Sequence, residues 1–75
     1  SSDAEKLIAK MQDKDICTEQ QYFDIEKEVK FFLKSNAPQT DKQKVLGYAE
    51  SLSMICAAIR EGKLVIAKKK ENDKG

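Results

Sequence analysis

The two cysteines are the side chains of this sequence best suited to redox or metal chemistry. Cys17 and Cys56 lie 39 residues apart. Neither belongs to a Cys-x-x-Cys pair, so a zinc site would need carboxylates to complete its four ligands. The acidic residues that lie close together in the sequence do not have the spacing of a calcium-binding loop with its central glycine. We expect them to lie on solvated helix faces and turns; they are Asp13, Asp15, Asp24, Glu26 and Glu28.

The sequence lacks other common elements of an active site. It contains no histidine, which removes the most frequent general base and metal ligand of proteins. Its three glycines, Gly47, Gly62 and Gly75, are too scattered for a phosphate-binding loop or a dinucleotide fingerprint. A chain of 75 residues also has little room for a substrate cavity. We therefore expect a protein that is not an enzyme and that uses no cofactor or metal.

The composition is that of a small globular domain. Hydrophobic residues make up 40% of the chain, enough for a packed core. Fourteen basic and 13 acidic residues leave a net charge of +1, which argues against nucleic acid or an anionic membrane as the partner. No apolar run approaches the roughly 20 residues of a membrane span, so we expect no such span.

Two amphipathic helices are predicted in the first half of the chain. Apolar residues at helical spacing predict a first helix from Asp3 to about Gln12. Thr18 followed by Gln21 has the pattern of a capping box, and the apolar residues behind it predict a second helix that ends near Lys34. Pro38 follows, and a proline ends a helix because it lacks the backbone N–H.

A third helix is predicted to begin at Thr40, which has Gln43 three residues later, and to end at Gly62 as a C-terminal cap. The short apolar segment 63–67 fits either a continuation of this helix or an extended arm. Together the patterns predict an all-α fold: a small three-helix bundle built on an antiparallel hairpin, with a short N-terminal helix packed across it. Residues 1–67 would form this single domain, and residues 68–75 a flexible, basic polar tail that frays.

The hairpin brings the two cysteines toward each other. Folding the chain about the turn near Pro38 places Cys17 roughly opposite residue 58, half a turn from Cys56, so the two Cα atoms could reach the separation that a disulfide needs. The alternative is that both are reduced and buried as small apolar side chains. A disulfide would indicate a periplasmic or secreted protein, and reduced cysteines a cytoplasmic one.

The exported alternative has a parallel among known families. Cys17-Thr18-Glu19 opens a predicted helix, Cys56 lies in a later one, and Lys68-Lys69-Lys70 follows near the end of the chain. In this layout the chain resembles the small periplasmic acid-stress chaperones, which are all-α and carry one disulfide. The resemblance implies an exported stress or interaction protein in which a Cys17–Cys56 bond joins two helices.

The predicted helices have more apolar surface than one small core needs. Phe31 faces away from the main stripe of the second helix and shares that far side with Phe23, with Lys27 between them. Leu46 and Met54 form a similar second set on the third helix. Either the first helix and the Leu64–Ile66 arm cover these residues, or a partner does. We favour a protein-interaction module, an adaptor, regulator or chaperone-like protein, whose partner is another protein or a second copy of the chain; its expected binding residues are Phe23, Lys27, Phe31, Leu46 and Met54.

Overall fold

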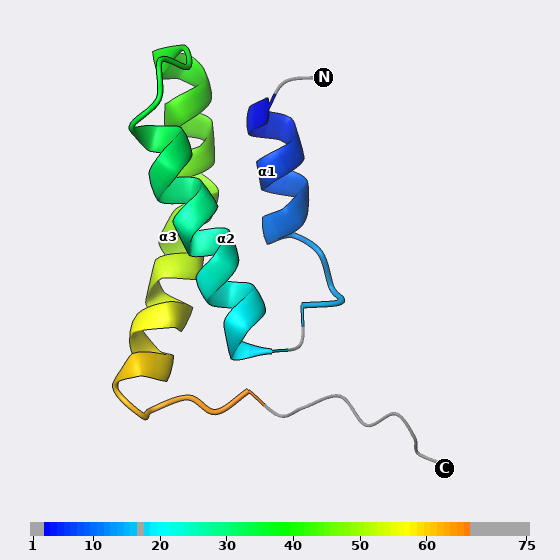
Figure 1. Cartoon of the computed structure of the whole chain (residues 1–75), viewed down its shortest axis with the longest axis vertical. Coiled ribbons are helices and arrows are strands. Elements are labelled where there is room, and N and C mark those ends of the chain that lie inside the picture. Colours follow the sequence, from blue (N-terminus) through cyan, green and yellow to red (C-terminus); the bar gives the residue numbers. More distant parts are fainter. Residues whose placement is uncertain (1–2, 17, 67–75) are drawn as a thin grey trace.

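The fold of the described part of the chain is a bundle of three helices. The computed structural model describes residues 3–16 and 18–66, and within them it contains three helices and no strand (Figure 1). The helices are α1 (Asp3–Met11), α2 (Glu19–Leu33) and α3 (Gln39–Arg60). Successive helices run in opposite directions, and each packs against the other two (Figure 1). This confirms the all-α bundle built on a helical hairpin.

Local interactions fix both ends of α2. The Thr18 hydroxyl accepts a hydrogen bond from the Gln21 backbone N–H at 3.1 Å, and the Gln21 side chain accepts one from the Thr18 N–H at 3.1 Å. This is the predicted capping box, which satisfies N–H groups that have no partner within the helix. At the other end the Ser35 hydroxyl donates to the Phe32 carbonyl at 2.6 Å and accepts from the Ala37 N–H at 3.2 Å. The turn toward α3 is thereby closed by its own polar groups.

The beginning of α3 differs from the prediction. Pro38, and not Thr40, is the N-cap, and no side chain caps this end. The Pro38 carbonyl accepts the first helical hydrogen bond, from the Lys42 N–H at 3.1 Å. Proline serves here because its backbone is extended at ψ 144° while its φ of −57° already suits the approach to a helix. The helix therefore begins at Gln39, and Thr40 lies inside its first turn.

The predicted end of α3 is confirmed at Gly62. The helix ends at Arg60, and Gly62 has a φ of +74°, the left-handed conformation that glycine adopts without a steric penalty. The Lys63 N–H then donates to the Ala58 carbonyl at 2.9 Å, which completes the cap. Residues 64–66 continue as non-helical chain, so the extended alternative applies to them. The predicted tail, 68–75, lies outside the described residues.

The core is formed by the apolar stripes that the spacing indicates. Val45 and Cys56 of α3 are fully buried, and α1 and α2 each turn an apolar face toward them. Tyr48, on the same helix as Val45 and Cys56, is 44% exposed. The buried apolar residues are Ala4, Leu7, Ile8, Ile25, Val29, Val45, Ala49, Leu52, Cys56 and Ile59. None of the three helices is long and apolar enough to cross a membrane.

Candidate functional site

A groove lies between α1 and α2, formed by described residues of both helices and of the turn after α2. It is open to solvent and has a volume of about 750 Å³. Residues along α1 form one wall. The second half of α2 and residues 35–37, which follow it, form the other wall. Its lining residues are Asp3, Lys6, Leu7, Lys10, Lys27, Glu28, Phe31, Phe32, Ser35, Asn36 and Ala37. The groove thus unites residues from two helices and a turn, with apolar and charged side chains together.

Two consecutive phenylalanines give the groove its aromatic surface. They point about 100° apart because each residue turns an α-helix by that angle. Phe32 is half-buried and packs against the core, whereas Phe31 is 80% exposed. A side chain of this size in water keeps most of its apolar area available for a partner. Phe31 is therefore the strongest candidate for a binding anchor in the described part of the chain.

Charged side chains surround this apolar surface. Lys10 Nζ of α1 lies 2.8 Å from Glu28 Oε1 of α2, an ion pair that joins the two walls. Both side chains are about half exposed, so the pair is screened by solvent and contributes little to the stability of the fold. Lys6 on α1 and Lys27 on α2 are exposed. Lys27 and Phe31, predicted to lie together, thus line the same groove. Lys6 and Lys10 of α1 line it as well, and the sequence pattern did not indicate them.

The structure places the other predicted binding residues elsewhere. Met54 is 72% exposed and lies about 200° around α3 from the buried Cys56, on the outer face of that helix. Leu46, 49% exposed, lines a smaller hollow of about 270 Å³ with Leu33 and the first turns of α3. Met54 remains exposed, so the Leu64–Ile66 arm does not cover it; Leu64 and Val65 are themselves 36% and 79% exposed.

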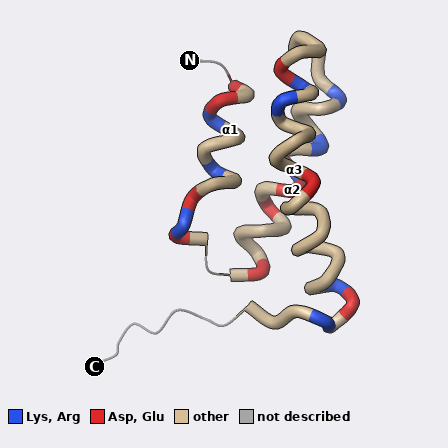
Figure 2. Tube along the Cα trace, turned by 180° about the vertical axis from the view of Figure 1, so that it is seen from behind, with Lys and Arg blue, Asp and Glu red and all other residues tan. Residues whose placement is uncertain are grey.

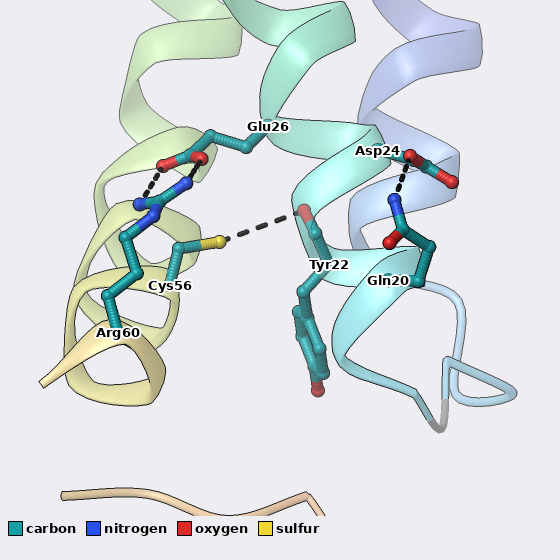
Figure 3. Close-up of polar contacts among 6 residues, drawn as sticks. All are labelled: Gln20, Tyr22, Asp24, Glu26, Cys56 and Arg60. Atoms are coloured by element: carbon teal, nitrogen blue, oxygen red, sulfur yellow. Dashed lines mark hydrogen bonds and ion pairs between the residues drawn. The ribbon is translucent and has the colours of Figure 1, made fainter. Parts of the chain in front are cut away.

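Phe23 belongs to a polar cluster that joins α2 to α3. The ring is half-buried, packs against the core and has the Arg60 guanidinium carbon 4.7 Å from its centroid. Arg60 also donates two hydrogen bonds to the carboxylate of Glu26 (Figure 3). This guanidinium therefore links an aromatic face and a carboxylate, an arrangement in which cation–π and ion-pair attraction act together. Phe23 and Phe31 do not share one surface.

Glu26 corrects the expectation that the grouped carboxylates are all solvated. Its exposure is only 8%. Hydrogen bonds from Arg60 hold the pKa of this carboxyl below its ordinary value, against the opposite effect of burial. The two residues are 34 positions apart, so no local pattern could have paired them. Asp24, one turn from the Gln20 amide and hydrogen-bonded to it at 2.8 Å, remains exposed as expected.

Cys56 lies beside this cluster and carries a free thiol. Its Sγ donates to the Tyr22 carbonyl at 3.7 Å, and the residue is completely buried (Figure 3). Burial raises the pKa of the thiol, with a further rise from the nearby Glu26 carboxylate. The neutral thiol acts here as a small core side chain. Cys17 lies outside the described residues, and with Cys56 free the structure gives no support to the predicted Cys17–Cys56 bond.

Comparisons with models of protein families, with curated protein sequences and with solved structures find no match to this chain. Within residues 3–16 and 18–66, no three metal-ligating side chains lie close enough together to hold an ion.

Proposed function

We propose that this protein is a non-enzymatic interaction module that binds an amphipathic helix of a partner protein in the groove between α1 and α2. The observation that carries this proposal is the exposure of Phe31, at 80%, on the wall of a groove of about 750 Å³. Apolar grooves between helices commonly receive the apolar face of a third helix. In a three-helix bundle, such a helix would complete a four-helix arrangement.

The energy available at Phe31 is sufficient for a binding anchor. A fully covered aromatic side chain buries about 150–250 Å², so Phe31 still offers roughly 120–200 Å² at its observed exposure. A partner that covers half of this area gains about 2 kcal/mol at ~25 cal/mol per Å². That corresponds to about 30-fold in Kd, the size of a binding hot spot.

The test is the affinity of the protein for a designed peptide helix with leucines on one face and uncharged glutamines elsewhere. Fluorescence anisotropy of the labelled peptide gives the Kd for wild type, Phe31→Ser and Val65→Ser. Val65 is the matched control, because it is apolar and 79% exposed but lies outside the groove. We expect saturable binding that Phe31→Ser weakens about 30-fold and that Val65→Ser leaves unchanged.

Two results would contradict the proposal. Equal losses with Phe31→Ser and Val65→Ser would show that any exposed apolar residue holds the peptide. A loss with Met54→Ser, while Phe31→Ser binds like wild type, would place the binding surface on the outer face of α3. Far-UV circular dichroism of each variant establishes that the helices are intact.

A further inference from the structure

Acidic and basic residues are separated along residues 13–46, although the net charge of the chain is close to zero. Residues 27–46 contain five lysines and two carboxylates, whereas residues 13–26 contain one lysine and five carboxylates. The basic segment holds the second half of α2 and the beginning of α3, and the acidic segment leads into the first half of α2 (Figure 2). The α2 wall of the groove belongs to the basic segment. The charged side chains that line the whole groove are three lysines and two carboxylates, so a partner there meets a small excess of positive charge.

The rim of the groove has the same sign. Lys6 and Lys10 stand on the α1 wall and Lys27 on the α2 wall, against the carboxylates of Asp3 and Glu28. Glu28 is already paired with Lys10. Among the ion pairs of the described residues, none involves Lys6 or Lys27. These two cations flank the apolar surface from opposite sides and are available to carboxylates of a ligand.

We propose that the occupant of the groove is an acidic amphipathic helix of a partner protein. Its apolar residues contact Leu7, Phe31 and Phe32, and carboxylates on both sides of its apolar stripe pair with Lys6 and Lys27. The α1 wall from Asp3 to Lys10 is about 10 Å long, so two helical turns of the partner fit against it. This inference rests on the proposed function and adds the chemistry of the partner.

Charge also argues against the chain's own C-terminal residues as the occupant. Residues 67–75 contain four lysines and two carboxylates, and like charges at short range oppose docking. A second copy could offer its acidic segment 13–26, and this alternative is distinguished by the state of association of the protein alone.

The experiment compares three peptides with the same leucine face, whose flanking positions are all glutamate, all glutamine or all lysine. We expect the glutamate peptide to bind about three- to tenfold more tightly than the glutamine peptide and the lysine peptide to bind more weakly, as two screened ion pairs allow. Raising the salt concentration from 50 to 300 mM should remove the difference. The double variant Lys6→Glu/Lys27→Glu should reverse the order, and Lys14→Glu, the same change outside the groove, should preserve it.

The outcomes separate this inference from the proposed function. If the three peptides bind equally and Phe31→Ser still weakens all of them, the groove binds helices but the acidic partner is wrong. If the lysine peptide binds best, the inference is likewise overturned. If the protein alone sediments as a dimer that Phe31→Ser dissociates, a second copy is the occupant. If no peptide responds to Phe31→Ser, the proposed function itself fails.

Discussion

The adjacent residues Phe31 and Phe32 allow binding to be separated from folding by substitutions at neighbouring positions. Both are phenylalanines in the last turns of α2, so their truncation to alanine is the same chemical change. Phe32 packs against the core, and Phe31 is 80% exposed. We therefore expect Phe32→Ala, which also removes a contact in the groove, to lower the free energy of unfolding, and Phe31→Ala to lower only the affinity for a partner helix.

The expected magnitudes follow from burial. Truncating a fully buried phenylalanine costs about 3–5 kcal/mol, so the half-buried Phe32 should cost about 2 kcal/mol. Phe31→Ala loses little buried area, and alanine has the better helix propensity. These two effects nearly cancel, so the free energy of unfolding should change by less than about 0.5 kcal/mol. For a domain of this size 1 kcal/mol shifts Tm by roughly 4–8 °C. Phe32→Ala should thus lower Tm by about 8–16 °C, and Phe31→Ala should change it by less than about 4 °C.

The assay is thermal unfolding followed by circular dichroism, with peptide anisotropy measured on the same two samples. A drop in Tm for Phe31→Ala as large as that for Phe32→Ala would refute the reasoning. Phe31 would then contribute to the core, and the groove would lack its exposed anchor.

Three further predictions concern stability. Gly47→Ala should stabilise the protein to urea by about 1 kcal/mol, because Gly47 is inside α3 and a Cβ there meets no atom within 4 Å. Gly62→Ala should destabilise it by about 1 kcal/mol, because the φ of Gly62 is +74°. Changes of the same sign in the free energy of unfolding of the two variants would contradict this prediction. The lowered pKa of Glu26 gives stability that is present above pH 4.5 and is lost as the pH falls through the lower pKa of the folded state. Glu26→Gln should therefore reduce the pH dependence of the free energy of unfolding, measured with urea, in this range. An unchanged pH dependence would rule out the Arg60 ion pair as its cause. The raised pKa of Cys56 gives stability that is present below pH 9 and is lost at higher pH, because the unfolded chain ionises first; Cys56→Ala should remove this alkaline loss, and its persistence would assign the loss to other groups.

The fold could be predicted from the sequence because its signals are local. Apolar spacing located the three helices, and the Thr18 capping box and Gly62 marked two of their ends. The predicted beginning of α3 was wrong, because a Thr-x-x-Gln pattern is as compatible with the first turn of a helix as with its N-cap. Pro38 is the N-cap of this helix.

The candidate site could be predicted only in part. Phe31 and Lys27 are two residues of one helix that the apolar surplus of α2 indicated, and the structure brings them into one groove. The contribution of Lys6 depends on how α1 packs across the hairpin, which no spacing encodes. The pairing of Glu26 with Arg60 is a contact between residues 34 positions apart, and it depends on the register of α2 against α3.

The most direct test of binding in the α1–α2 groove is a titration of the isotopically labelled protein with the glutamate peptide, followed by backbone amide chemical shifts. We expect the largest changes at residues 3–10 and 27–37, which form the two walls, with Lys14 and Val65 unaffected. The largest changes around Met54 on the outer face of α3, or saturable binding with no change along α1, would contradict the assignment of this groove as the binding site.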